Sequence, residues 1–285
     1  MAIVPRGTKG NPSVTRIIAI VNQKGGVGKT TTAVNLAACL AHNGMETILI
    51  DLDPQGNATS GVGINKRGVE SSIFDPLIEN IPLSSILRPT SMTSLRIAPS
   101  NNDLLSVEMH LASEENGNRR LRTALAQFLW SINAEKRVDY VIIDCPPSFG
   151  MLSMNAILAA DSVLIPVQCE YYALEGLTEI LTSTTVIREQ YNKSLSLAGI
   201  LLTMSDRRLN LSRQVEEDIR QAYCNYVFET VINRSVRLSE APSYGMPIIL
   251  YDPSSTGADS YISLALEVIE NETKSLRPWP LRSSG

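Results

Sequence analysis

Long hydrophobic runs are missing from this 285-residue chain. No apolar stretch approaches the ~20 residues that a helix needs to cross a bilayer, which argues against a helical membrane span. Residues 1–15 also lack the apolar segment of a secretory signal peptide, and we expect them to form a flexible arm. Residues 275–285 are rich in Pro and Ser, and we expect a flexible tail there. No linker or repeat interrupts residues 16–274, which predicts one globular domain.

Cysteine is scarce, and an excess of positive charge is absent. The four cysteines are far apart and form no C-x-x-C motif; they are Cys39, Cys145, Cys169 and Cys224. Their apolar or helical surroundings favour buried, reduced thiols in a cytoplasmic protein. The net charge of −4 excludes nucleic-acid affinity that comes from the whole surface, so any such binding requires a local basic patch.

A glycine-rich stretch at residues 22–31 is the most informative part of the sequence. It lies between the apolar run 17–21, which indicates a buried parallel strand, and residues 32–41, whose apolar spacing indicates a helix. Its glycines let backbone N–H groups converge at a helix N-terminus, whose partial positive charge attracts phosphate. Lys29 can then contact the β- and γ-phosphates, and the Thr30 hydroxyl can hold Mg²⁺. A glycine-rich turn that binds nothing is the alternative, and the agreement of strand, glycines, Lys-Thr and helix argues against it.

The residues expected to contact the nucleotide from this loop are Lys24, Gly25, Gly26, Val27, Gly28, Lys29, Thr30 and Thr31. The stretch departs from the ordinary phosphate-loop pattern G-x-x-x-x-G-K-[ST]. Gln23 stands where the first glycine would be, and a second lysine, Lys24, follows it.

Strand-like and helix-like segments alternate along the rest of the chain. The expected strands are residues 17–21, 46–50, 94–98, 140–144, 162–167, 197–203 and 227–232. The expected helices are residues 32–41, 119–132, 151–160, 174–191, 211–223 and 257–274. This alternation predicts an α/β fold of the P-loop NTPase type: a doubly wound, mostly parallel sheet with helices on both faces.

Acidic residues follow two of the expected strands. Asp144 ends an apolar strand as a Walker B acid does and could orient Mg²⁺ through water, the alternative being an acid that caps the strand. Asp51 and Asp53 precede a Pro/Gly loop, which suits a site at the carboxyl edge of an α/β sheet. Asp53 could position the water that attacks the γ-phosphate, and Asp51 could lie in the outer shell of magnesium. An Asx turn before Pro54 is the alternative, and the residues by themselves do not separate these roles.

Five motifs together resemble the small chromosomal ParA (Soj-like) partition ATPases of the ParA/MinD family. The first, Gln-Lys-Gly-Gly-Val-Gly-Lys-Thr-Thr-Thr at residues 23–32, is similar to the deviant Walker A box of that family. Two more are Asp-Leu-Asp-Pro-Gln-Gly-Asn-Ala-Thr-Ser-Gly at 51–61 and Ile-Ile-Asp-Cys-Pro-Pro-Ser at 142–148. The last two are Leu-Thr-Met-Ser-Asp-Arg-Arg-Leu-Asn-Leu at 202–211 and Val-Arg-Leu-Ser-Glu-Ala-Pro-Ser-Tyr-Gly at 236–245. The resemblance covers nearly all of residues 15–270.

The resemblance implies slow, Mg²⁺-dependent hydrolysis of ATP to ADP and phosphate, for chromosome or plasmid segregation. It implies that ATP joins two subunits face to face, that Lys24 reaches the other subunit's nucleotide, and that Asp53 supports hydrolysis. It further implies a ParB-type centromere-binding partner that stimulates hydrolysis. The ATP dimer of such proteins binds DNA non-specifically, so a cytoplasmic, nucleoid-associated protein without membrane contact is expected.

Basic residues gather between residues 206 and 240. Six arginines lie there together with six acidic residues, so composition alone favours a solvated, salt-bridged face. The resemblance instead implies that Arg208 and Arg237, on adjoining loops, contact DNA phosphates, and Arg234 is a third candidate. Family members often have Ile-Pro-Arg-Asn near the adenine where this chain has Ile-Asn-Arg-Ser at 232–235. The base contacts are therefore open, with Pro242 and Tyr244 as the expected adenine neighbours.

Three other functions are weighed against this one. A MinD-like membrane ATPase would need a C-terminal amphipathic helix with basic and bulky apolar faces, and the acids and prolines of residues 267–280 argue against it. An iron–sulphur carrier of the nitrogenase iron-protein type would need two suitably placed cysteines per subunit, and Cys145 has no evident partner. A non-catalytic scaffold, in which ATP sets dimerisation and Asp53 does little, stays open.

Overall fold

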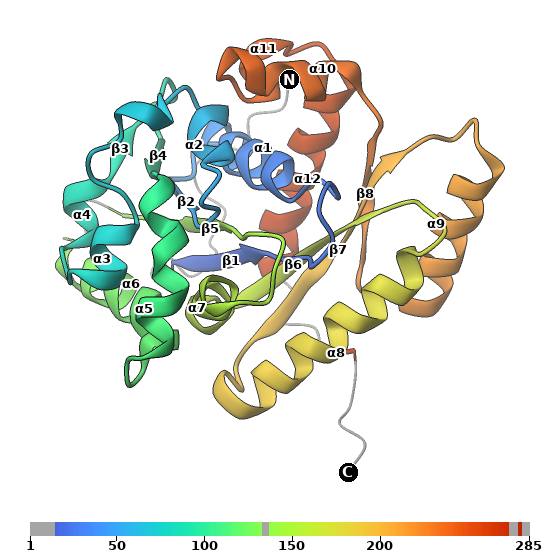
Figure 1. Ribbon diagram of the computed structural model, residues 1–285. Helices are drawn as coiled ribbons and strands as arrows, with labels where there is room; N and C mark the ends of the chain where they lie inside the picture. Colours follow the sequence, from blue (N-terminus) through green and yellow to red (C-terminus); the bar gives the residue numbers. More distant parts are fainter. Residues whose placement is uncertain (1–14, 133–136, 274–278, 281–285) are drawn as a thin grey trace.

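The computed structural model describes residues 15–132, 137–273 and 279–280, and within them one sheet of eight strands organises the fold (Figure 1). The strand order is β3-β4-β2-β5-β1-β6-β7-β8. Every neighbouring pair is parallel except β3 and β4, which are antiparallel. The strands are β1 (Arg16–Ile20), β2 (Thr47–Asp51), β3 (Arg88–Pro89), β4 (Leu95–Ala98), β5 (Tyr140–Asp144), β6 (Ser162–Gln168), β7 (Ser196–Ser205) and β8 (Val227–Asn233).

Helices cover both faces of this sheet. The α-helices are α1 (Lys29–His42), α2 (Asn57–Gly61), α3 (Phe74–Ile78), α4 (Leu83–Ile86), α5 (Val107–Ala112), α6 (Arg120–Ser131), α7 (Met151–Ala159), α8 (Ala173–Tyr191), α9 (Asn210–Tyr223), α10 (Val236–Glu240), α11 (Ile248–Tyr251) and α12 (Thr256–Thr273). The 3₁₀ helices are η1 (Lys66–Gly68), η2 (Asn102–Ser106), η3 (Gly117–Arg119) and η4 (Ala241–Tyr244). The predicted doubly wound, mostly parallel α/β fold is confirmed.

Strand β1 shows how the sequence divides the core into two layers. Its side chains alternate between faces, as in any strand. Ile17 and Ala19 pack in the layer formed with α3 to α9, whereas Ile18 and Ile20 pack in the layer formed with α1, α2 and α10 to α12. Figure 1 shows the same division, with α1 and α12 on one side of the sheet and α7 and α8 on the other. Since β1 is buried on both faces, its continuous apolar run is explained.

The strand order brings segments that are distant in the chain to one edge. The ends of β1, β2 and β5 lie together, because Ile20 pairs with Asp144 and Asp51 pairs with Asp144 in the sheet register. The loops after these strands therefore meet at the carboxyl edge of the sheet, the usual place for a ligand site in such folds.

Some expectations need correction or lie outside the described residues. Cys39, Cys145 and Cys169 are buried as predicted, but Cys224 is exposed, because it follows α9 in a surface turn. The antiparallel edge strand β3 was not expected; its two residues are too few to show a strand pattern.

The predicted terminal segments are described only in part. Residues 1–14, 274–278 and 281–285 lie outside the described ranges. Thr15 donates a hydrogen bond from its hydroxyl to the Val138 carbonyl, and the Trp279 indole N–H donates to the Thr185 hydroxyl at 2.7 Å. In the described part of the chain, no helix has both the length and the apolar character to cross a membrane.

Candidate nucleotide-binding site

The glycine-rich loop joins the end of β1 to the start of α1, as the sequence predicts. Gly26 and Gly28 have φ angles of +75° and +89°, a left-handed conformation that glycine adopts without steric cost. The space beside Gly25 and Gly26 is open, with no further heavy atom within 4 Å of where a side chain would begin. No side chain of the described residues caps the N-terminus of α1. The loop is thus an open cradle whose backbone N–H groups can receive an anion.

Two buried hydrogen bonds from neighbouring strands hold this loop. The Thr203 hydroxyl at the end of β7 donates to the Val27 carbonyl at 2.9 Å. Asn22 donates from its side-chain amide to the Pro166 carbonyl in β6 at 2.7 Å, and its Oδ1 accepts the N–H of Lys24. Sequence reasoning missed both residues. A polar residue at the end of an otherwise apolar strand is the signal that could have found them.

Lys29 lies buried at the base of the loop. Its ammonium group donates to the Lys24 carbonyl at 2.9 Å. Burial lowers the pKa of Lys29, and the negative charge of Asp144 opposes this effect. Because the lysine charge is kept in a partly dehydrated place by nearby carboxylates, its interaction with an incoming phosphate would be strong.

Asp144 and Asp51 end adjacent strands, and both are fully buried. Asp51 accepts three hydrogen bonds, from the backbone N–H of Asp53 and from the backbone N–H and hydroxyl of Thr59. Both carboxylate oxygens of Asp144, in contrast, are buried without a hydrogen-bond partner among the described residues. Burial raises the pKa of Asp51 to about 6, and burial together with the charge of Asp51 raises the pKa of Asp144 well above its usual range.

The orphaned Asp144 carboxylate tests whether magnesium fits this site. Buried charges are normally paired or bound to a metal, and Asp144 has the oxygen donors that Mg²⁺ prefers. Thr30 is the second residue of α1, in the same loop-to-helix turn, and Asp51 is the neighbour of Asp144 across the sheet. The residues present therefore fit Mg²⁺ held by Thr30 and Asp144, with Asp51 behind them.

Asp53 forms the turn that follows β2. One oxygen of its carboxylate accepts the N–H of Gln55 at 2.9 Å, which is the Asx turn expected as the alternative reading. Its backbone carbonyl accepts the hydroxyl of Ser100 at 2.6 Å. The side chain is buried, and it lies near enough to Lys29 for its charge to raise the lysine pKa. The turn thus holds Asp53 beside the phosphate cradle.

Lys24, the unusual lysine of the loop, faces solvent. Its ammonium group forms a salt bridge with Glu170 at 3.1 Å, and both side chains are about half exposed. Glu170 follows β6 and was not predicted, since nothing in its sequence context marks it. Such an exposed pair contributes little stability, about 0–1 kcal/mol, so Lys24 can exchange Glu170 for another anion.

A cavity of about 320 Å³ opens beside the start of α1. Its lining residues come from α1, α2 and η4 and their ends: Thr30, Thr31, Val34, Asn35, Asn57, Ser60, Gly61, Ala241, Pro242 and Met246. Pro242 therefore lies across this cavity from the start of α1, and its contact with adenine stays a prediction. Tyr244 does not line the cavity; it is 64% exposed and packs against Tyr251 with ring centroids 4.9 Å apart.

The basic residues lie at the far edge of the same end of the sheet. Ser205 and Asn233 pair at the ends of β7 and β8, and the Arg234 N–H donates to the Ser205 carbonyl, so the following loops begin side by side. Arg208 is in the loop before α9, with 87% of its side chain exposed. The sequence predicts a loop at Arg237, but this residue lies in α10, because Ser235 caps a short helix there.

Each of these two arginines has an acidic partner. Arg208 donates two hydrogen bonds to Asp206, which lowers the pKa of that carboxyl to about 2. Arg237 pairs with Glu240 at 3.1 Å and Asp252 at 3.4 Å. The salt-bridged face inferred from composition is thus present, and its exposed pairs are weak enough to open for a phosphate.

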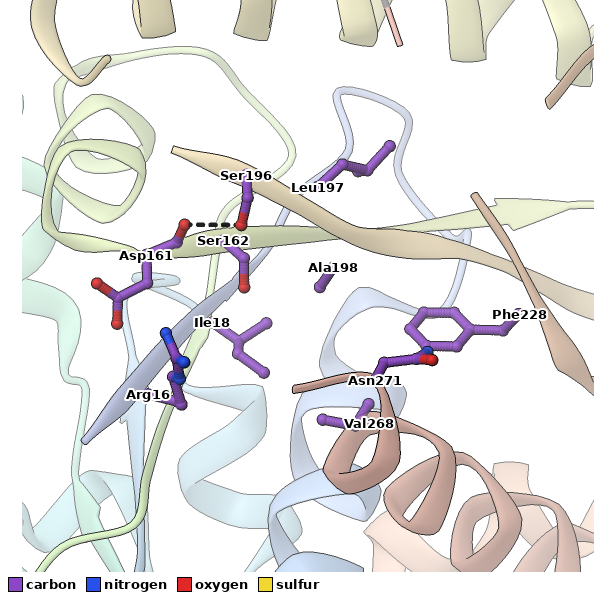
Figure 2. A pocket seen from close by; sticks show the side chains of 10 residues that line it. All are labelled: Arg16, Ile18, Asp161, Ser162, Ser196, Leu197, Ala198, Phe228, Val268 and Asn271. Carbon is purple, nitrogen blue, oxygen red and sulfur yellow. Dashed lines mark hydrogen bonds between the residues drawn. The ribbon is translucent and has the colours of Figure 1, made fainter. Parts of the chain in front are cut away.

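A second cavity lies at the opposite, amino-terminal edge of the sheet (Figure 2). It has a volume of about 50 Å³ and lies between the starts of β1, β6 and β7 and the end of α12, with Ile18, Phe228 and Val268 in its apolar wall. Because β1 runs from this edge to the glycine-rich loop, the cavity is separate from the phosphate cradle.

Comparison with known proteins agrees with this geometry. A family described as an AAA domain matches residues 15–197. The chromosome partitioning protein ParA of Myxococcus xanthus (strain DK1622) is 48% identical over 268 residues, which are 94% of this chain and 93% of that protein. The sporulation initiation inhibitor protein Soj of Bacillus subtilis (strain 168) is 50% identical over 256 residues, 90% of this chain and 99% of that protein. The crystal structure of cobyrinic acid a,c-diamide synthase from Mycobacterium smegmatis with bound ADP and magnesium has a TM-score of 0.79 and 31% identity, and the match covers 95% of this chain and 100% of that one.

Proposed function

We propose that this chain, which belongs to the ParA/Soj family of chromosome-partitioning P-loop ATPases, binds ATP with Mg²⁺, hydrolyses it to ADP and phosphate, and uses it to control DNA binding. The observation that carries the proposal is the fully buried Asp144 carboxylate, unpartnered among the described residues, beside an open glycine cradle. A buried carboxylate that accepts no hydrogen bond is costly, and a metal–phosphate ligand would remove that cost. Two structures of one similar protein support it: the synthase from M. smegmatis carries ADP and magnesium in one, and an ATP analog and magnesium in the other.

The residues of the cradle have separate tasks in the proposed reaction. The backbone of residues 24–28 and the Lys29 ammonium would bind the phosphates, and Thr30 with Asp144 would hold the metal. Bound Mg²⁺ would neutralise charge on the β- and γ-phosphates. Asp53, which its turn holds near Lys29, would orient the attacking water.

Lys24 is proposed to act on the nucleotide of a second subunit. Its half-exposed ammonium group and its weak pairing with Glu170 leave it able to reach outward. Charge supplied across an interface would make ATP part of the contact that holds the dimer. Lys24→Ala should therefore weaken the ATP-dependent dimer several-fold, as measured by light scattering, while the monomer still binds ATP; an unchanged dimer would contradict this role.

DNA binding is proposed to follow from dimerisation. Arg208, Arg234 and Arg237 lie at one edge of each subunit, so two subunits would present two basic patches to one duplex. Contacts of this kind bind phosphates without reading sequence. The proposed setting is the nucleoid, with a ParB-type protein as the partner that stimulates hydrolysis.

The experiment that tests the function compares three nucleotide states. Phosphate release is measured with Mg²⁺ and ATP, and binding to DNA duplexes of unrelated sequence is measured with ATP, with ADP and without nucleotide. We expect phosphate release, and DNA binding that is tight only with ATP. Equal DNA binding in all three states, or the absence of phosphate release, would refute the proposal.

A further inference from the structure

Asn35 is a buried polar residue that the proposed chemistry does not use. It lies one turn after Thr31 in α1, and it is 5% exposed. Its side-chain amide donates to the Thr31 carbonyl at 2.8 Å, within the helix. Its Oδ1 accepts the backbone N–H of Ile248 at 2.7 Å, from a residue 213 positions away in the chain. One side chain thus joins the helix of the phosphate loop to a distant C-terminal segment.

The Ile248 N–H is a group that needs such a partner. Ile248 is the first residue of α11, and the first N–H groups of a helix have no acceptor within the helix. Ile248 is fully buried, so water cannot replace Asn35. Because Pro247 precedes it and has no N–H, this hydrogen bond fixes the point where the chain enters α11.

The segment held in this way forms a wall of the 320 Å³ cavity. Pro242 and Met246 line that cavity from one side, and Thr31 and Asn35 line it from α1. A close backbone approach supports the same wall from the turn after α2: a side chain at Gly245 would begin 3.0 Å from the Cα of Gly63. The phosphate cradle, in contrast, is built from residues 24–28 and does not depend on this wall.

We propose that Asn35 is a positioning residue for the nucleoside half of the ATP site. By accepting the Ile248 N–H it holds residues 241–248 against α1, and so it shapes the cavity that receives the base and ribose. This inference rests on the proposed ATP binding. It assigns the affinity for the phosphates to the glycine cradle and part of the affinity for the nucleoside to Asn35.

The key variant is Asn35→Ser. A serine hydroxyl can donate to the carbonyl one turn earlier, so the bond to Thr31 can be kept, but the side chain is too short to reach Ile248. Asn35→Leu, of similar size, removes both bonds and serves as the second variant. Asn43→Ser is the matched control, because Asn43 ends the same helix and donates to the Cys39 carbonyl at 2.8 Å, four residues back, without lining the cavity.

The experiment measures binding of ATP and of inorganic tripolyphosphate, both with Mg²⁺, by calorimetry or by competition, together with the thermal midpoint of each variant. Tripolyphosphate presents the same phosphate chain without a nucleoside. We expect Asn35→Ser and Asn35→Leu to bind ATP roughly tenfold more weakly, because a buried N–H loses its acceptor and the wall is released. Binding of tripolyphosphate should change less than twofold, and Asn43→Ser should match the wild type for both.

The outcomes separate the inference from the function on which it rests. If the Asn35 variants lose affinity for ATP and for tripolyphosphate equally, or if only their thermal midpoint changes, Asn35 supports the fold and the inference is wrong. If the wild type binds ATP no better than tripolyphosphate, the cavity does not receive a nucleoside and the inference is again wrong. If the wild type binds neither compound, the proposed ATP binding itself has failed.

Discussion

Replacing Asp144 with asparagine should stabilise the nucleotide-free protein and weaken its binding of MgATP. Asp144 is fully buried, and neither of its oxygens accepts a hydrogen bond from the described residues. The carboxylate of Asp51 lies beside it at the end of the neighbouring strand. Asp144→Asn keeps the shape of the side chain and removes a buried charge that the nearby Lys29 ammonium offsets only in part.

The size of the effect can be estimated from the neighbouring acid. Burial raises the pKa of Asp51 from 3.8 to about 6, which corresponds to about 3 kcal/mol against its charged form. At Asp144, burial and the charge of Asp51 raise the pKa, and the nearby Thr30 hydroxyl and Lys29 ammonium oppose this only in part, so the pKa lies well above its usual range. A buried amide without a partner still costs free energy, so we expect a net gain of about 1–3 kcal/mol in the free energy of unfolding.

The pH dependence follows from the direction of these shifts. Both acids have folded-state pKa values above their unfolded values, so they bind protons more tightly when folded. Their charged forms therefore impose no penalty below the unfolded pKa, and stability is lost as the pH rises through the folded values. The advantage of Asp144→Asn should accordingly be large at neutral pH and small near about pH 4.

Asp51→Asn provides a matched control of opposite sign. It relieves the same repulsion, but Asp51 accepts three hydrogen bonds, and an amide would turn N–H groups toward donors from Asp53 or Thr59. We expect this variant to be destabilised by about 1–3 kcal/mol.

Urea unfolding of the wild type and both variants, without nucleotide and with MgATP, measures these effects. The wild type should gain stability from MgATP, and Asp144→Asn should gain much less. A destabilised Asp144→Asn at neutral pH, or one that MgATP stabilises as strongly as the wild type, would show that Asp144 is not a metal-site carboxylate.

Three further predictions concern binding, hydrolysis and DNA. Lys29→Ala should weaken ATP binding by at least about a hundredfold in a nucleotide titration, since the phosphates lose a dehydrated cation, and wild-type affinity would remove Lys29 from the site. Asp53→Ala should keep ATP binding and lose hydrolysis, so that dimers accumulate in size-exclusion chromatography with ATP; normal turnover would place water positioning elsewhere. Arg208→Glu with Arg237→Glu should weaken DNA binding equally for all sequences and lower the salt slope by about 1 per lost phosphate contact, with ATP binding retained. Arg88→Glu is the control, because Arg88 lies on β3, at the opposite end of the strand order from β8. If the wild type, the double variant and the control bind DNA with equal affinity, Arg208 and Arg237 belong to a solvated face that does not contact DNA.

Local features of the sequence were enough to predict most of the architecture. The turn from β1 to α1 is contiguous, so its glycines and Lys29 could be recognised without knowledge of the rest of the fold. Periodicity marked the long elements, because alternation and helical spacing report which side chains a single element buries. Short elements such as α10 were not predicted, since five residues hold too few apolar positions to show a period.

What the sequence by itself determined is therefore the list of chemical groups that reach the carboxyl edge of the sheet, including Asp51, Asp53 and Asp144. Only the tertiary structure decided how each group is partnered. Thr59 hydrogen-bonds Asp51, while both carboxylate oxygens of Asp144 in the adjacent strand lack a hydrogen-bond partner among the described residues, and the different roles proposed for the two acids rest on this difference. In the sequence, Asn35 is likewise one more polar residue of a helix. Only the structure shows that the backbone N–H of Ile248, 213 positions later, donates a hydrogen bond to it. The physical reason is that the order of the strands in the sheet determines the neighbours of a buried polar group, and no local sequence pattern predicts that order. Because the group is buried, the presence or absence of a hydrogen-bond partner changes the free energy of folding strongly.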